Sequence, residues 1–242
     1  MCTVSYVPHA VDSFCLTSSR DEMLVRKPAS DPDLYEFGTT QILFPKDQEK
    51  GGTWVGSSSL KTTLCLLNGA FENHEPCDSY RMSRGQLVLD VFKTQNVLSL
   101  LREYNFDGIA PFTLIIIRIK DSIRLHEFRW DGSTTHLIEL DGQDTHIWSS
   151  CTLYSKEDAR KKEHIFQEKV TYDNSFQSVF NLHENGIPEN PNLMRYTQNP
   201  AYKTKSITQI VGNKESAVVK HKHLDGNKVS EKVIFYDTIY AE

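Results

Sequence analysis

The order of strand-like and helix-like segments is the feature that most limits the folds open to this 242-residue chain. Apolar or alternating runs predict strands in residues 1–70, in 111–140 and again in 205–236. Two helical regions, 83–104 and 155–183, separate these blocks. Such blocks differ from the strand-by-strand alternation with helices that marks a doubly wound parallel sheet. The order predicts one α+β domain, residues 1–242, whose antiparallel sheets use both ends of the chain.

Local signals predict where several segments begin and end. Ser83 is a good N-cap for one helix, and Ser155 with Asp158 forms a capping box that opens another. Residues 4–18 indicate a hairpin of two strands, whereas the charged, proline-containing stretch Leu24–Tyr35 predicts a loop. The second strand of the hairpin therefore ends in a charged cluster near the start of the chain.

Composition excludes several classes of function. The net charge is −5, so no basic excess indicates a nucleic-acid partner. No apolar run approaches the ~20 residues of a membrane-spanning helix, and the first residues lack the pattern of a secretory signal. Together these observations predict a protein without an integral membrane segment, in the cytoplasm, where thiols stay reduced. Five cysteines is an odd number, which rules out complete internal pairing.

Other candidate sites are weak. Glu72, His74 and Cys77 have no standard metal-ligand spacing, and no motif for a nucleotide or other cofactor is present, so we expect no metal and no cofactor. Two histidines on one strand face, His221 and His223, predict a solvated pair. Three cysteines lie in or beside apolar strand segments and indicate thiols in the core: Cys15, Cys65 and Cys151.

Cys2 follows only the initiator Met1. Because cysteine is small, we expect an aminopeptidase to remove Met1, which would leave a thiol and a free α-amine on one residue. Their ordinary pKa values, about 8.5 and 7.7–8.0, both lie near neutrality. The amine can then act as a base for its own thiol, as in N-terminal nucleophile enzymes. The alternative is that Cys2 is simply tolerated after Met1.

The cluster Ser19-Arg20-Asp21-Glu22 ends the second strand of the predicted hairpin. A hairpin would bring Arg20 back beside residue 2, where a cation stabilises a thiolate. Asp21 would either hold the Arg20 side chain or receive the α-ammonium group. Taken alone, such a cluster is usually a solvated strand end.

Five motifs occur in one order: MC at the start, SRDE at 19–22, GGTWVG at 51–56, LLNG at 66–69 and SRGQLV at 83–88. In this order they resemble the NRDE family, also called the transport and Golgi organisation protein 2 family. The resemblance covers at least residues 2–93 and, more weakly, the whole chain. It implies an αββα four-layer sandwich of the N-terminal nucleophile hydrolase kind, similar to the choloylglycine and penicillin acylase branch.

The resemblance also implies roles for individual residues. Cys2 would be the nucleophile, Arg20 and Asp21 would shape its surroundings, and Asn68 would supply an amide on the oxyanion side. Four further positions are implied at the substrate, with a structural role open for the first two: Trp54, Arg84, Ser150 and Lys205. Ser150 and Lys205 depart from the family pattern, because an amide is replaced by a hydroxyl and an arginine fork by a single ammonium group.

Two functions follow from the resemblance. The first is an N-terminal cysteine hydrolase that cleaves a linear, non-peptide C–N amide bond in a small-molecule substrate. The second is a non-catalytic carrier or trafficking factor on the same fold, linked to Golgi organisation, secretion and lipid or haem handling. The departures at residues 150 and 205 favour the second. Neither the substrate nor the oligomeric state follows from the sequence.

Overall fold

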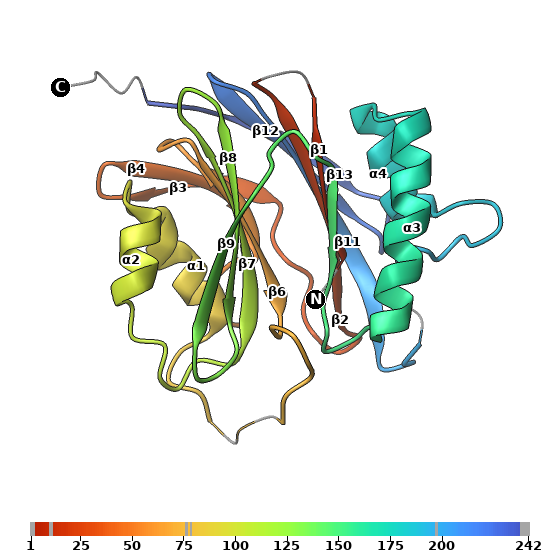
Figure 1. Ribbon diagram of the computed structural model, residues 1–242, viewed down its shortest axis with the longest axis horizontal. Helices are drawn as coiled ribbons and strands as arrows, with labels where there is room; N and C mark the ends of the chain where they lie inside the picture. The colour runs from red at the N-terminus through yellow and green to blue at the C-terminus, as the bar shows by residue number, and fades with distance from the viewer. Residues whose placement is uncertain (1–2, 10–11, 76, 78, 197, 238–242) are drawn as a thin grey trace.

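The blocks of strand-forming sequence assemble into two antiparallel sheets, and pairs of helices cover their outer faces (Figure 1). The predicted α+β class and its αββα layering are confirmed. The computed structural model describes residues 3–9, 12–75, 77, 79–196 and 198–237. In this part of the chain, no helix is long and apolar enough to cross a membrane.

Both ends of the chain contribute to the first sheet. Its order is β10 (His146–Ser149), β1 (Thr3–Pro8), β2 (Phe14–Met23), β11 (Tyr202–Gly212), β12 (Ser216–His223) and β13 (Val229–Phe235). The β1–β2 hairpin pairs Thr3 with Ser19, and β11 pairs Thr204 with Asp21 on the other side of β2. The predicted hairpin is therefore confirmed, and β2 lies inside the sheet.

The second sheet contains the consecutive middle strands of the chain. Its order is β3 (Pro32–Phe37), β4 (Thr40–Pro45), β5 (Val55–Ser58), β6 (Thr62–Asn68), β7 (Phe112–Ile119), β8 (Ile123–Trp130) and β9 (Thr135–Leu140). The loop predicted over Leu24–Tyr35 is wrong in its last four residues, which belong to β3. Pro32 is tolerated because it is the first residue of an edge strand, where the missing N–H breaks no ladder.

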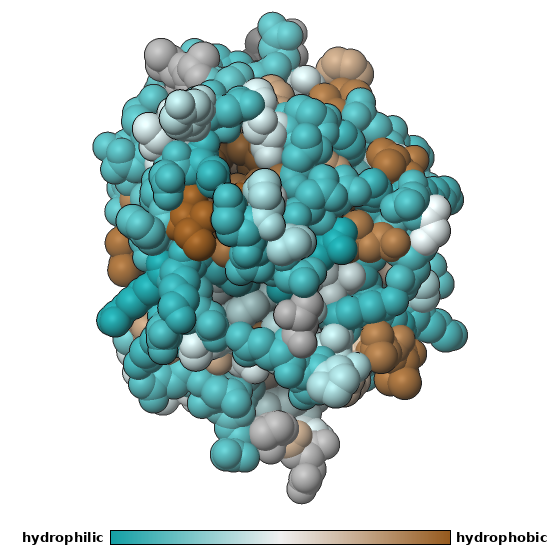
Figure 2. All heavy atoms as spheres, turned by 90° about the vertical axis from the view of Figure 1, so that its right-hand side faces the viewer, coloured by the Kyte–Doolittle hydropathy of each residue, from teal (hydrophilic) through white to brown (hydrophobic). Residues whose placement is uncertain are grey.

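Four helices form the outer layers: α1 (Arg84–Phe92) and α2 (Val97–Glu103) on the second sheet, α3 (Lys156–Tyr172) and α4 (Phe176–Asn185) on the first. The predicted caps are confirmed, because Ser83 accepts the Gln86 N–H and Ser155 accepts the Asp158 N–H. Figure 2 views the α3 and α4 side, where hydrophilic residues dominate and apolar ones lie in separate spots. These helices therefore turn their apolar stripes inward.

Side chains of β1 alternate between two apolar layers. Val4 and Tyr6 are buried in the core between the sheets, whereas Val7 packs in a smaller core under α3 and α4. Thr3 and Ser5 also face the helices, because they bind Lys162 of α3 and His183 of α4. The first strand thus separates a face toward the second sheet from a face toward the helices.

The cysteine predictions are confirmed at two positions and corrected at the third. Cys15 and Cys65 are fully buried thiols, whereas Cys151 is partly exposed. Cys151 follows β10 in a turn rather than lying in a strand, so its neighbours do not enclose it.

Candidate functional site

Arg20 on β2 is one of the most deeply buried charged residues, with 1% of its surface exposed. Its Nη2 donates to Asp47 Oδ2 at 2.9 Å and lies 3.4 Å from Glu22 Oε2. The guanidinium carbon lies 4.8 Å from the centre of the Trp54 ring. Its Nε and Nη1 have no acceptor among the described residues. The site therefore holds a fixed cation, two of whose donors are unused by the described part of the chain.

Asp21 lies on the opposite face of the same strand, so the predicted alternative in which it holds Arg20 is wrong. Side chains alternate across a strand, and neighbours point to opposite faces. The Asp21 carboxylate accepts hydrogen bonds from Tyr154 Oη at 2.8 Å and Thr204 Oγ1 at 2.6 Å. Complete burial raises the pKa of Asp21, although both hydroxyls oppose that shift. The carboxylate that does hold Arg20 is Asp47.

Two residues of the helix layer fix the beginning of β1. Lys162 Nζ donates to Thr3 Oγ1 at 2.8 Å and lies 3.1 Å from the centre of the Tyr154 ring. His183 bridges β1 and β2, because its two ring nitrogens lie 2.8 Å from the hydroxyls of Ser5 and Ser19. Burial lowers the pKa of His183 to about 3, so the ring is neutral near pH 7. These contacts fix the open end of the β1–β2 hairpin from the helix side of the sheet.

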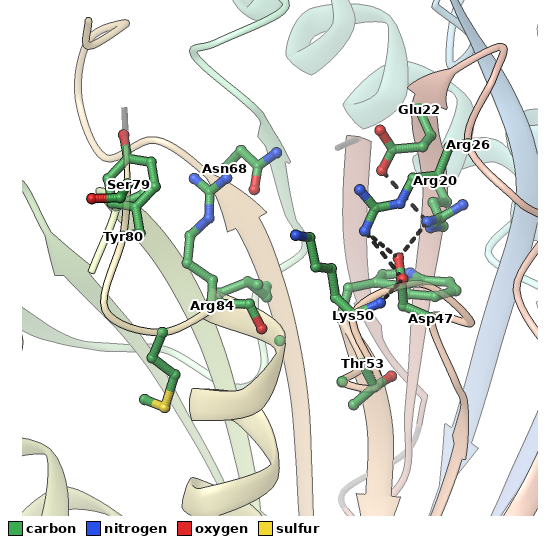
Figure 3. Close-up of a pocket in the computed structure, with 17 residues that line it drawn as sticks. Arg20, Glu22, Arg26, Asp47, Lys50, Thr53, Asn68, Ser79, Tyr80 and Arg84 are labelled. Carbon is green, nitrogen blue, oxygen red and sulfur yellow. Dashed lines mark hydrogen bonds and ion pairs between the residues drawn. The ribbon is translucent and has the colours of Figure 1, made fainter. Parts of the chain in front are cut away.

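A cavity of about 510 Å³ opens on the Arg20 side of the sheet, and we call it the Arg20 cavity (Figure 3). Trp54, Asn68 and Arg84, three of the predicted site residues, line it together with Arg20. The loop before β5 supplies Asp47 and Lys50, and the start of α1 supplies Arg84. Its volume is that of a pocket for a small organic molecule.

Asn68 ends β6 at the rim of this cavity. Its Oδ1 is buried and has no hydrogen-bond partner among the described residues. Its backbone carbonyl accepts the Ser150 hydroxyl at 2.7 Å, and that hydroxyl also lies 2.9 Å from Thr152 Oγ1. Ser150 is not among the cavity-lining residues, so its role at the substrate stays a prediction.

The two predicted cations differ in position. Arg84 lines the Arg20 cavity, and its Nη1 donates to the Pro111 carbonyl at 2.9 Å. Burial lowers the pKa of Arg84 to about 10. Lys205 is not a lining residue, because its ammonium group donates to the backbone carbonyls of Leu24 and Arg26. It holds the turn after β2, and contact with a substrate stays a prediction.

Three residues of this region were missed from the sequence: Asp47, Lys50 and Lys162. For Lys162 a signal was present, because it precedes the buried Phe166 and Val170 at four-residue intervals on α3. A lysine at a core-facing position of a helix needs a polar partner. Asp47 and Lys50 lie in a charged loop, where the sequence does not separate solvated from paired groups.

The structure bears differently on two other predictions, the nucleophile Cys2 and the solvated pair His221 and His223. The predicted nucleophile, Cys2, lies outside the described residues. The solvated histidine pair is wrong for His221, which is fully buried with its Nδ1 2.8 Å from Thr208 Oγ1. Its strand lies between β11 and β13, and its ring packs near Trp54 in the core between the sheets. Burial lowers the pKa of His221 to about 3, so it is neutral near pH 7.

Comparisons with known proteins agree with this fold. The family model described as Transport and Golgi organisation 2 matches residues 1–227. No curated protein matches the chain significantly. A mutant conjugated bile acid hydrolase from Clostridium perfringens superposes with a TM-score of 0.60 at 6% identity, covering 99% of this chain and 97% of the other.

Two further solved structures are similar. Penicillin V acylase from Agrobacterium tumefaciens gives a TM-score of 0.56 at 12% identity, covering 96% of this chain and 85% of that one. The Caenorhabditis elegans orthologue of N-acylethanolamine-hydrolyzing acid amidase gives 0.52 at 11% identity, covering 86% and 92%. At such identities these likenesses show the shared fold.

Proposed function

The chain belongs to the Transport and Golgi organisation 2 family, and from this premise we propose that it is an N-terminal cysteine hydrolase. Its substrate is a small molecule with a linear, non-peptide C–N amide bond. The similar solved structures include hydrolases and acylases by name, namely a conjugated bile acid hydrolase, a penicillin V acylase and an N-acylethanolamine-hydrolyzing amidase. The proposal applies the chemistry in those names to the Arg20 cavity.

The proposed reaction has two steps. After removal of Met1, the α-amine of Cys2 takes the thiol proton, and the sulfur attacks the amide carbonyl carbon. The C–N bond breaks, the amine product leaves with that proton, and a thioester joins the acyl group to Cys2. A water molecule then attacks the thioester, releasing a carboxylic acid and restoring the thiol.

The buried Arg20 guanidinium is the observation that carries this proposal. The register of β1 and β2 pairs Thr3 with Ser19. Arg20 is the next residue of β2 after this pair, in the direction in which β1 leads back to the start of the chain. A cation at this end of the strand lowers the pKa of a nearby thiol and favours the thiolate. Arg20 lines the cavity, and its Nε and Nη1 have no partner among the residues that the structure describes.

Asp21 and Asn68 complete the proposed machinery. The Asp21 carboxylate, fixed by Tyr154 and Thr204, is an acceptor for the α-ammonium form of the amine on the helix side of the sheet. Asn68 offers its side-chain amide to the oxyanion that forms on the substrate carbonyl. Removing one such donor typically costs ~2.7–4 kcal/mol of transition-state stabilisation.

The test is covalent trapping. The purified protein is incubated with a panel of N-acyl amides, quenched and analysed by peptide mass spectrometry. We expect mature chains that begin at Cys2, an acyl adduct on that residue and no turnover by Cys2→Ala. Cys77→Ala, which removes an exposed thiol elsewhere in the chain, is the matched control and should turn over normally. Retention of Met1, or turnover by Cys2→Ala, contradicts the mechanism.

One observation favours the carrier as a second candidate. The Ser150 hydroxyl is already bound to the Asn68 carbonyl, so it does not replace the amide that the family pattern has at this position. A site short of one oxyanion donor binds an acyl compound without hydrolysing it efficiently. For a carrier, Cys2→Ala retains ligand binding and cellular function, whereas an enzyme loses its function. A small-molecule partner and a cytoplasmic location stay predictions in either case.

A further inference from the structure

The charges that line the Arg20 cavity are unbalanced. Four of the lining residues are cationic and two are anionic, in a chain whose net charge is −5. The cations are Arg20, Arg26, Lys50 and Arg84, and the anions are Glu22 and Asp47. A cavity more positive than the protein around it attracts and orients negatively charged molecules.

Both carboxylates in the cavity already have partners. Asp47 Oδ2 accepts from Arg20 at 2.9 Å and from Arg26 at 3.0 Å. Its Oδ1 also accepts the Lys50 backbone N–H at 2.9 Å. Glu22 is 3.4 Å from Arg20. The two acids thus neutralise the arginines of β2 and of the turn after it.

Lys50 and Arg84 are left over. Among the described residues, neither has a carboxylate within ion-pairing distance: Arg84 contacts a backbone carbonyl of Pro111, and no hydrogen bond of the Lys50 ammonium group is found. Figure 3 shows the Lys50 side chain reaching into the cavity between Arg84 and the Arg20–Asp47 pair. Lys50 is exposed, whereas Arg84 is half-buried, and a half-buried cation without a counter-ion is costly unless a ligand supplies the charge.

Unused donors in the same wall give an independent indication. Arg20 Nε and Nη1 and Trp54 Nε1 are buried and have no acceptor among the described residues. All three are donor-only atoms. Buried donors are nearly always satisfied, so a ligand rich in oxygen acceptors suits this wall better than an apolar one.

We propose that the Arg20 cavity selects amides that carry an oxyanion, a carboxylate or a phosphate, and that Lys50 and Arg84 bind that group. The inference rests on the proposed function for the reacting end of the substrate. In this arrangement Arg20 faces the amide and Lys50 and Arg84 face the anion. A cavity of about 510 Å³ has room for both ends of one small molecule.

The test measures binding in Cys2→Ala protein, where turnover does not interfere. Titration calorimetry compares the affinity of N-octanoylglycine with that of N-octanoylglycinamide, in which a neutral amide replaces the negatively charged carboxylate. We expect about tenfold tighter binding of the carboxylate, the change that a charge-assisted hydrogen bond gives. The preference should weaken between about 10 and 150 mM salt, because the Debye length falls from about 30 to 8 Å.

Variants identify the residues responsible. Lys50→Met removes an exposed ammonium group and should reduce the preference to about a third or less, whereas Lys50→Arg retains it. Lys27→Met, an exposed lysine outside the cavity lining, is the matched control and should keep the full preference. Arg84→Met should reduce the preference as well. If Arg84→Met unfolds because the Pro111 contact is lost, the three lysine variants still test the inference.

The outcomes separate this inference from the proposed function. Charge preference in a protein that forms no acyl adduct supports the anion site and rejects the hydrolase. Acyl transfer without charge preference supports the hydrolase and rejects the anion site. Equal affinity for the two probes, an unchanged preference in Lys50→Met, or no binding of either the carboxylate probe or inorganic phosphate overturns the inference.

Discussion

Replacement of Asp47 by asparagine tests whether the buried Arg20 depends on one carboxylate. The variant keeps the size of the side chain but removes its negative charge. Arg20 then remains 1% exposed, with Glu22 at 3.4 Å as its nearest remaining carboxylate, and Arg26 also loses its closest one. The exchange therefore leaves a buried cation largely uncompensated without creating a cavity.

The expected cost follows from the burial of the pair. Breaking a fully buried ion pair by removing one partner typically costs about 3–5 kcal/mol. Asp47 keeps 14% of its side chain exposed, and Glu22 and the asparagine carbonyl still act as acceptors. We therefore expect a loss of about 2–3 kcal/mol in the free energy of unfolding, a large share of the ~5–15 kcal/mol of a typical protein.

Urea denaturation at pH 7 measures this loss as a lower midpoint with an unchanged slope. The matched control is Asp33→Asn, which breaks a surface pair with Lys232 and should cost no more than about 1 kcal/mol. A variant of Asp47 that loses no more than this control would refute the reasoning, because Arg20 would not need the carboxylate.

The same comparison has a defined pH dependence. Burial acts to raise the pKa of Asp47, but the Lys50 backbone N–H and the Arg26 and Arg20 guanidinium groups outweigh it, and the pKa lies below its ordinary value. A depressed folded-state pKa gives stability that is present above the unfolded value of about 3.9 and is lost as the pH falls through the folded value. The difference in the free energy of unfolding between wild type and Asp47→Asn should therefore narrow below about pH 4. A difference that widens in acid contradicts a lowered pKa of Asp47.

Three further predictions follow. A Cβ at Gly52 would lie 2.4 Å from the Gly85 backbone carbon at the start of α1, so Gly52→Ala should destabilise the protein by about 1–3 kcal/mol in urea titrations. Burial raises the pKa of Cys15 and Cys65 to about 12, so iodoacetamide at pH 8 should leave both unmodified in the native protein while labelling exposed Cys77. If residues 1–242 form one domain, calorimetry should give one unfolding transition with equal calorimetric and van 't Hoff enthalpies, whereas two separate transitions contradict it.

The fold could be predicted where sequence signals are local. Ser83 and Ser155 mark helix starts through caps that act within one turn, and the hairpin over residues 4–18 joins neighbouring segments. The strands β3 and β10 were missed for two different reasons. β3 begins at a proline that is tolerated only at an edge, and the four residues of β10 show too little alternation to be recognised.

The site could be predicted only in part, because several of its contacts join residues that are distant in the sequence. The register of β1 and β2 is consistent with the predicted closeness of Arg20 to the chain start, but the partner of Arg20 comes from a loop 27 residues away. Asp21 binds Thr204, which is 183 residues away. No local pattern distinguishes such a carboxylate from a solvated one.

The pairing of β2 with β11 also has a consequence for biosynthesis. On a ribosome, Asp21 is made 183 residues before Thr204, its partner on the strand that pairs with the other edge of β2. Until β11 is made, the nascent β1–β2 hairpin has an unpaired edge on β2, and such an edge is a template for wrong pairing. Because such non-local pairing slows folding, this hairpin is exposed to wrong pairing for longer than a hairpin whose neighbouring strand follows it directly.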